Sequence, residues 1–233
     1  MRRNALADLR GKLMFREAIA AEVADHGPRF RSVRLEGTDL AGRGWNPGDR
    51  IHVRVDDGFT TRTYTPMGWD AASGSTRLLV YAHTSGPGSR WSRRLQPGTP
   101  CQVSGPFRSL KLSELAGPVV LAGDETSLAL ASALGKANGR NPLHAAIFEM
   151  TSPDECAKAL GLAHVGPAQV IGRHPSEAHL DALTGAVIEA LRSSREAFLC
   201  LTGKAQTINY VRRGVRATGL AGRPILVKAY WAA

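Results

Sequence analysis

The chain has 233 residues, of which 43% are hydrophobic and 6% aromatic, and it carries a formal net charge of +10 at pH 7. Its length exceeds the ~100–150 residues of a typical single domain, which predicts two compact domains. The positive charge favours anionic ligands, but the few aromatics and the lack of a nucleic-acid motif argue against a nucleic-acid partner.

The cysteines and the N-terminal segment exclude further classes. Cys101, Cys156 and Cys200 are widely spaced and have no neighbours at metal-ligand spacing, which predicts buried reduced thiols and neither disulfides nor zinc. Residues 1–22 have no unbroken apolar core of signal-peptide length, and no later apolar run is long enough to cross a bilayer. We therefore expect a cytoplasmic protein without a membrane partner.

The first half of the chain has the pattern of a small antiparallel barrel. From Arg29 to Ser109, short runs alternate apolar and polar residues, as in Arg50 to Val55. Pro-Gly turns precede two of these runs, at residues 45–49 and 95–99, and repeated turn–strand units favour closure into a barrel. Residues 1–113 also hold 18 Lys and Arg against 10 Asp and Glu, so this half dominates the electrostatic field.

Two short motifs within this half predict a flavin site. Arg62, Tyr64 and Thr65 offer a cation, a flat ring and a hydroxyl from one strand. About twenty residues later, Gly86-Pro87-Gly88-Ser89 forms a turn that opens a helix, so its N–H groups and the positive helix end suit a pyrophosphate. Each motif alone is an ordinary strand or turn sequence. The pair matches what FAD requires.

From Gly117 onward the pattern changes to alternating strands and helices, which predicts a parallel sheet with helices on both faces. The expected strands are 118–122, 143–148, 168–171, 197–201 and 224–230, and the expected helices are 127–136, 181–195 and 205–217. The segment from Phe107 to Leu115 is the expected domain boundary.

Five segments occur in the order and spacing of one known family. They are Arg62–Thr65, His83–Trp91, Gly105-Pro106 with Ser109, Leu121–Leu128, and Tyr230-Trp231. In these segments the chain resembles the siderophore-interacting proteins, FAD-dependent ferric-siderophore reductases of the ferredoxin reductase-like superfamily. The resemblance implies an N-terminal antiparallel Greek-key FAD-binding β-barrel, residues 1–113, followed by a C-terminal α/β NAD(P)H-binding domain with a parallel sheet, residues 114–233.

The resemblance also implies roles for single residues. Arg62 would hold a pyrophosphate oxygen, and Tyr64 would lie against the isoalloxazine or the ribityl chain. Thr65 would hydrogen-bond flavin N5, which makes Tyr64 and Thr65 the candidate catalytic residues. The backbone from Gly86 to Ser89 and the Ser89 hydroxyl would bind the phosphates. His83 either contacts flavin or is a structural residue with a local partner.

The second domain lacks a Gly-x-Gly-x-x-Gly motif and has Gly123-Asp124-Glu125-Thr126 after its first strand. Carboxylates there cap a helix well but repel phosphate, so we expect the pyrophosphate to avoid this turn. Asp124 and Thr126 would face the nicotinamide end or the flavin. Glu149 could favour the 2′-hydroxyl of NADH. The candidate cations for a 2′-phosphate of NADPH are Arg173, Lys204, Arg212 and Arg213, which leaves NADPH and NADH both open.

The C-terminal aromatic and several departures from the family pattern bear on the substrate. Trp231 would either gate the nicotinamide or bury its ring between the domains. Met67 stands where a basic residue is common, and only two alanines follow Trp231. Other departures are Gly88 for Ala, Ala129 for Pro, and Gly203-Lys204 for Gly-Glu.

The resulting hypothesis is a flavoenzyme that takes hydride from NADPH or NADH and passes single electrons to an anionic ferric siderophore. It needs no metal ligands because the iron arrives in its chelator, and a monomer is favoured. One alternative is a flavin reductase of the same fold that serves a redox protein, a quinone or an oxygenase. Another is a non-catalytic nucleotide-binding relative.

Overall fold

The structure is a computed structural model that describes residues 15–58, 60–83, 85–136, 139, 141–165, 168–220 and 222–232. Residues 1–14, part of the segment considered for a signal peptide, lie outside this range. Backbone contacts divide the chain into two compact units, one ending at Arg108 and the other continuing from Ser109, with His26–Pro28 assigned to the second. Within the described range, every helix is too short or too polar to traverse a lipid bilayer.

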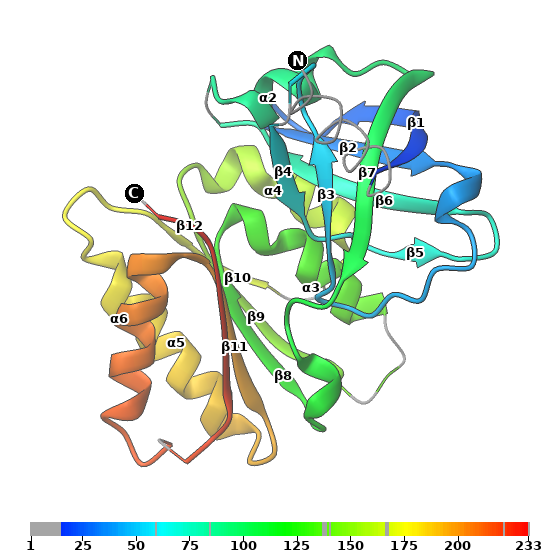
Figure 1. Cartoon of the computed structure of the whole chain (residues 1–233). Coiled ribbons are helices and arrows are strands. Elements are labelled where there is room, and N and C mark those ends of the chain that lie inside the picture. The colour runs from blue at the N-terminus through cyan, green and yellow to red at the C-terminus, as the bar shows by residue number, and fades with distance from the viewer. Residues whose placement is uncertain are drawn as a thin grey trace, which may run out of the picture. The chain divides into compact units, whose positions relative to one another are not determined.

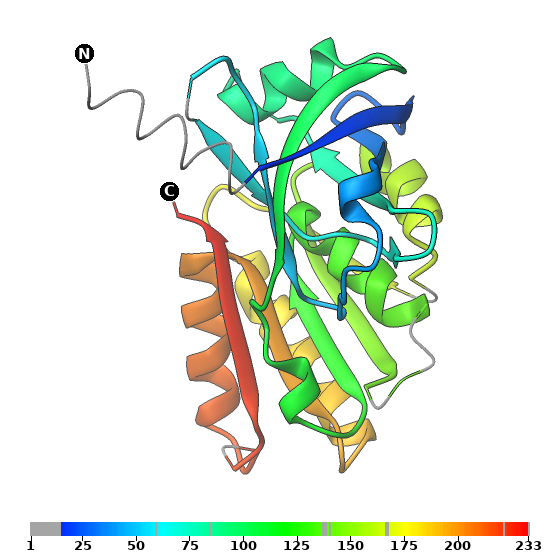
Figure 2. The same ribbon diagram turned by 45° about the vertical axis from the view of Figure 1, so that its right-hand side comes forward.

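The first unit is built on one antiparallel sheet of seven strands in the order β4-β3-β7-β1-β2-β6-β5 (Figure 1). The register shifts within the β1–β2 and β3–β7 pairs, where bulges bend a strand and increase the local twist. Figure 2 shows the pronounced curve of β7, drawn in green. The strands are β1 (Arg16–Asp25), β2 (Phe30–Glu36), β3 (Arg50–Arg54), β4 (Thr61–Tyr64), β5 (Trp69–Asp70), β6 (Ser75–Tyr81) and β7 (Thr99–Phe107), with helix α2 (Pro87–Arg94) before β7.

The predicted antiparallel barrel is confirmed as a curled half-barrel. Its core consists of alternating strand residues, among them Val33, Leu35 and Val53, none more than 2% exposed. Strands β4 and β5 form the two edges of this curled sheet. β5 has only two residues and pairs with β6 at two positions.

The second unit is a parallel five-stranded sheet in the order β10-β9-β8-β11-β12. It confirms the α/β pattern expected from residue 117 onward. The strands are β8 (Val119–Gly123), β9 (Leu143–Met150), β10 (Ala168–Gly172), β11 (Phe198–Lys204) and β12 (Ile225–Trp231). The helices are α3 (Leu128–Lys136), α4 (Pro153–Ala163), α5 (His179–Ser193) and α6 (Ala205–Arg216), and the short helix η3 (Glu125–Ser127) precedes α3.

Helices α5 and α6 pack on each other and on one face of this sheet (Figure 1). Their apolar side chains, such as Leu183 and Val211, share a core with Val120 and Leu199 of the strands. Helices α3 and α4 contact each other and the β9 and β10 strands. Since the strands are parallel, their carboxyl ends lie at one edge, and strand order reverses between β8 and β11. In open α/β sheets, ligands bind at this switch point.

Two elements were not expected from the sequence, β1 and α4. β1 reads Arg-Glu-Ala-Ile-Ala-Ala-Glu-Val-Ala-Asp, and its alanines and glutamates favour helix over strand. The three cysteines are free thiols and no more than 3% exposed, so the predicted burial is confirmed. Burial raises the pKa of the Cys101 thiol to about 11 and that of Cys200 to about 12.

Candidate functional site

Arg62 and Tyr64 lie on the edge strand β4 of the first unit, opposite Val53 and Ile51 of β3. Residues two apart on a strand share a face, so the guanidinium and the phenol ring project to the same side. The Arg62 side chain is exposed and donates through Nη1 to the Thr61 carbonyl at 2.8 Å. Tyr64 is half-buried, and burial raises the pKa of its hydroxyl, so the ring stays neutral at physiological pH.

The start of helix α2 lies directly against these two side chains. A Cβ on Gly88 would stand 2.9 Å from the Tyr64 hydroxyl and 3.2 Å from Arg62 Cγ. Glycine at this position therefore allows the helix backbone to approach strand β4. The two motifs, separate in sequence, form one surface.

The first turn of α2 has the features of a phosphate cradle. Gly86 is the N-cap and contributes no capping side chain, while Pro87 occupies the first turn. No N-cap side chain therefore occupies the N–H groups of that turn, which carry the positive end of the helix dipole. Ser89 is only 7% exposed, and its hydroxyl has no hydrogen bond to any other described residue. These groups, with Arg62, fit a pyrophosphate.

The remaining predicted residues of this unit have distinct surroundings. Trp91 packs in the core of the first unit with its ring centroid 5.8 Å from that of Tyr64. Thr65 follows the last residue of β4 and is half-buried. His83 is exposed and stacks on Tyr81 at 4.6 Å. This local partner supports the structural interpretation of His83, and its contact with flavin stays a prediction.

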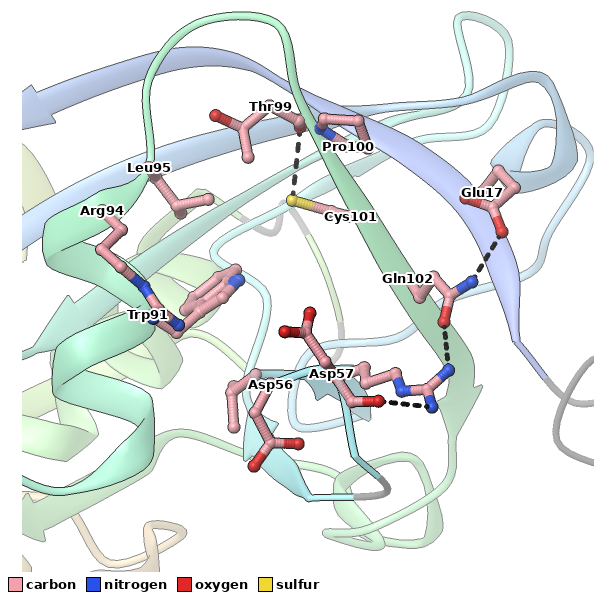
Figure 3. Close-up of a pocket in the computed structure, with 12 residues that line it drawn as sticks. Glu17, Asp56, Asp57, Trp91, Arg94, Leu95, Thr99, Pro100, Cys101 and Gln102 are labelled. Atoms are coloured by element: carbon pink, nitrogen blue, oxygen red, sulfur yellow. Dashed lines mark hydrogen bonds between the residues drawn. The ribbon is translucent and has the colours of Figure 1, made fainter. Parts of the chain in front are cut away.

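A hollow of about 470 Å³ opens on another part of the first unit, where α2, β7 and the β3–β4 connection meet (Figure 3). Asp56, Asp57 and Glu17 contribute carboxylates to it. Gln102 donates to Glu17 at 2.8 Å and accepts from Arg54 at 2.8 Å. These three carboxylates outnumber the two arginines of the lining, Arg54 and Arg94, so this hollow does not favour the anion expected at α2.

In the second unit, Asp124 follows β8 and caps the helix that begins there. Its carboxylate accepts from the backbone N–H of Thr126 at 2.9 Å and from the Thr126 hydroxyl, while the Ser127 hydroxyl bonds back to the Asp124 N–H at 3.3 Å. This reciprocal capping box confirms the capping role predicted for the acidic turn. The Asp124 residue is fully buried, and burial raises the pKa of its carboxyl.

A buried ion cluster, missed by the sequence analysis, lies beside this cap. Arg173, just after β10, stands 3.0 Å from Glu125, 3.4 Å from Glu149 and 3.6 Å from Asp124. Glu149 also binds His179 at 2.8 Å and accepts from a threonine hydroxyl of α6 at 2.7 Å. Burial pulls the pKa of Arg173 down, but Glu125 and Glu149 outweigh it and raise that pKa. One signal could have found the cluster: each of these residues lies next to a strand's carboxyl end.

Trp231, the last residue of β12, belongs to the same cluster. Its indole N–H donates to Asp124 Oδ2 at 2.7 Å. Arg173 and Lys204 lie 5.6 and 5.9 Å from its ring, within cation–π range. The structure thus joins the three predicted residues of this unit, Asp124, Thr126 and Trp231. Trp231 was expected either to gate the nicotinamide or to bury its ring between the domains, and both stay predictions. Within the second unit, its indole N–H is hydrogen-bonded to the carboxylate that caps the helix.

The same contacts correct two expectations about the dinucleotide. Glu149 is 1% exposed and engaged by Arg173, His179 and Thr207, so it cannot meet the 2′-hydroxyl of NADH. Arg173 faces three carboxylates, which neutralise it and make it unsuitable as a clamp for a 2′-phosphate. Lys204 forms an ion pair with Glu177 at 3.5 Å. Across the residues described, no group of His, Cys, Asp and Glu has metal-binding geometry.

Comparisons with known proteins fit this geometry. Residues 49–110 match the family described as siderophore-interacting FAD-binding domain. That range contains Arg62, Tyr64, Thr65 and the start of α2, so the predicted resemblance and the FAD cofactor are confirmed for this part of the first unit. No curated protein sequence matches the chain.

Solved structures extend the likeness to nearly the whole fold. A siderophore utilization protein from T. fusca has 24% identity and a TM-score of 0.65, with 94% of this chain and 92% of that chain covered. The siderophore-interacting protein SipS from Aeromonas hydrophila has 20% identity and a TM-score of 0.70, with the same coverage. A ferredoxin NADP+ reductase from Neisseria gonorrhoeae, with bound FAD and NADP, has 15% identity and a TM-score of 0.72, with 94% and 99% covered. The chain therefore has the ferredoxin reductase-like fold.

Proposed function

Because residues 49–110 match a siderophore-interacting FAD-binding domain, we propose that the chain is an NAD(P)H-dependent ferric-siderophore reductase. It takes a hydride from the nicotinamide and transfers single electrons to iron held in an anionic chelator. The observation that carries the proposal is the contact between Gly88 of α2 and the side chains of Arg62 and Tyr64, inside the matched region. It gathers a cation, a ring and the start of helix α2 on one surface.

Each of these groups has a task in holding FAD. The Arg62 guanidinium and the backbone N–H groups of Gly88 and Ser89 bind the pyrophosphate, where charge-assisted hydrogen bonds are strong. The neutral Tyr64 ring covers an apolar face of the cofactor. Thr65, placed after the strand, donates or accepts a hydrogen bond at flavin N5 and so orients the hydride acceptor. When bound, FAD supplies the conversion of a two-electron hydride into single electrons.

The second unit receives the nicotinamide at the switch point between β8 and β11. Asp124 is held by Thr126 and Trp231, and the excess of carboxylates there keeps phosphates away. The uncharged carboxamide and ring of the nicotinamide fit this place better than its pyrophosphate does. Trp231, at the surface of the cluster, moves aside when the nicotinamide enters.

The acceptor follows from charge and electron balance. One NADPH loses a hydride, becomes NADP⁺, and supplies two electrons, which reduce two Fe(III) chelates to Fe(II). Fe(II) binds hard oxygen donors less tightly than Fe(III), so the metal leaves its chelator. Exposed arginines surround α2, namely Arg62, Arg90, Arg93 and Arg94, and they attract an anionic chelate.

An anaerobic absorbance experiment tests the proposal. The protein is loaded with FAD, NADPH or NADH is added, and a ferric hydroxamate or catecholate follows. We expect the flavin band to bleach with the nicotinamide and to return with the ferric chelate. Bleaching without return of the flavin band would indicate another electron acceptor, such as a redox protein or quinone. Failure of the protein to bind FAD would refute the flavin site.

A further inference from the structure

The hollow of about 470 Å³ on the first unit is lined by donors from one element and by carboxylates from another (Figure 3). The second half of helix α2 contributes Trp91 and Arg94, whose polar groups donate hydrogen bonds. The β3–β4 connection contributes the carboxylates of Asp56 and Asp57. The groups assigned to FAD lie at the start of α2, so the hollow is a separate feature of the first unit. Its volume falls within the roughly 300–1,000 Å³ of small-molecule sites.

The indole N–H of Trp91 is a buried donor at the edge of this hollow. Trp91 is only 7% exposed and its ring packs in the core of the first unit. No other described residue accepts a hydrogen bond from its Nε1. Figure 3 draws this nitrogen on the side of the ring that faces the hollow. Since a buried tryptophan N–H usually has a hydrogen-bond partner, we expect the acceptor to enter from the hollow, as water or as a ligand atom.

The two aspartates of the β3–β4 connection keep their negative charge. The Asp57 carboxylate has no hydrogen bond or ion pair with any other residue that the structure describes. Hydrogen bonding by Thr60 and, to a smaller extent, the charge of Arg54 lower the pKa of Asp56, so this carboxylate is ionised. Arg54 itself donates to neutral oxygens, among them Gln102 Oε1 at 2.8 Å. The aspartates can therefore receive a positively charged group.

Arg94 supplies the opposite charge from the last turn of α2. Its side chain is exposed and forms no ion pair with another residue in the described part of the chain. The helix dipole favours a basic residue at this end of α2, but it does not explain the unmatched indole donor beside it. Trp91 and Arg94 are three residues apart and so lie on the same face of the helix. Both donors can meet one acceptor group.

We propose that the hollow binds a small zwitterion, a molecule with a protonated amine at one end, a carboxylate at the other and an apolar chain between them. The carboxylate accepts hydrogen bonds from the Trp91 N–H and the Arg94 guanidinium, and the ammonium group donates to Asp56 and Asp57. The chain lies against the apolar side chain of Leu95 in the lining. A ligand with a single charge would leave either the donors of α2 or the aspartates unmatched.

NMR of the nitrogen-labelled full chain tests this site through the Trp91 indole. The chain has four tryptophans and hence four indole N–H peaks, and the Trp91 peak is the one absent from Trp91→Phe. The ligands are ε-aminocaproate and, as molecules of single charge, hexylamine and caproate. We expect ε-aminocaproate to shift the Trp91 peak and leave the other three unmoved. It should bind about tenfold or more tightly than either comparator, as one additional charge-assisted hydrogen bond implies.

Two exposed residues test the two ends of the ligand separately. Asp57→Asn should weaken binding of ε-aminocaproate and hexylamine by about tenfold and leave that of caproate unchanged. Arg94→Gln should weaken binding of ε-aminocaproate and caproate and leave that of hexylamine unchanged. Asp39→Asn is the matched control, because Asp39 is an exposed carboxylate of the same unit and does not line the hollow. It should change none of the three affinities.

The outcomes decide the assignment without reference to the proposed function, because the titration requires no flavin reduction. Equal affinities for the three ligands, or equal losses in Asp57→Asn and Asp39→Asn, overturn the zwitterion site even if the chain reduces ferric chelates. Failure of all three ligands to shift any indole peak shows that the hollow holds only water and also overturns it. If Trp91→Phe does not fold, the affinities of the two exposed variants still decide. The expected pattern supports the site even if no ferric chelate is reduced.

Discussion

Gly203→Ala should strongly destabilise the second unit. Gly203 lies near the end of β11 at a φ of +102°, and an added Cβ would stand 2.6 Å from Asp124 Cγ and even closer to Oδ2. A non-glycine residue in such a conformation costs of order 1–3 kcal/mol. Pushing the Asp124 carboxylate away also loses at least one of its hydrogen bonds, worth about 1.5–3 kcal/mol for a charged group. We expect a loss of ~2.5–6 kcal/mol in the free energy of unfolding, the sum of these two costs.

The assay is urea unfolding followed by the helical circular dichroism signal. That signal reports mainly on the second unit, which contains α3 to α6, whereas the described part of the first unit contains α2 and one short 3-10 turn. Gly185→Ala in α5 is the matched control, because Gly185 is exposed and a Cβ there would meet nothing within 4 Å. It should stabilise by about 0.5–1 kcal/mol through helix propensity. Unfolding of Gly203→Ala at the wild-type urea concentration would refute the packing of β11 against the Asp124 cap.

Three further predictions concern single side chains. Arg62→Ala should lower FAD affinity about tenfold or more in a fluorescence titration, because a charge-assisted hydrogen bond is lost. Replacing the exposed Arg43 with Ala should leave the affinity unchanged. Equal FAD affinities of Arg62→Ala and the wild type would show that Arg62 does not bind the phosphates. Trp231→Phe should cost about 1–3 kcal/mol in urea unfolding, because the buried Asp124 carboxylate loses a donor, and a wild-type midpoint would contradict the hydrogen bond. Burial raises the pKa of Asp124, so the folded state binds the carboxyl proton more tightly than the unfolded state does. The free energy of unfolding of the wild type should therefore fall, relative to that of Asp124→Asn, as the pH rises from the ordinary carboxyl pKa of 3.8 towards the raised value. A stability difference between the two proteins that is independent of pH would contradict this.

Local sequence signals predicted most of the second unit because each element there is bounded by its own pattern. The apolar run before Gly123 and the acidic turn after it gave both β8 and the capping role of Asp124. α4 was missed although Pro153, Asp154 and Glu155 form an ordinary helix start. β1 could not be read locally, since its alanines become strand residues only through pairing with β2 and β7.

The two candidate sites also differ in how much of each could be predicted from the sequence. The segments that gather at α2 were predictable, because turn and strand residues there carry the chemistry themselves. The engagement of Arg173 by Glu125 and Glu149 depends on which strand ends become neighbours, and sequence spacing does not encode that. For this reason Arg173 and Arg213 could not be distinguished from the sequence. In the structure Arg173 lies among carboxylates, whereas Arg213 lies on an exposed face of α6.

The position of Trp231 gives the second unit an optical probe of its own. The other three tryptophans, Trp45, Trp69 and Trp91, belong to the first unit, so Trp231 is the only indole among residues 109–233. Its N–H meets a carboxylate and its ring lies within 6 Å of two cations. Indole emission depends on the charges around the ring. A change in the protonation or contacts of this cluster should therefore shift the wavelength of the Trp231 emission.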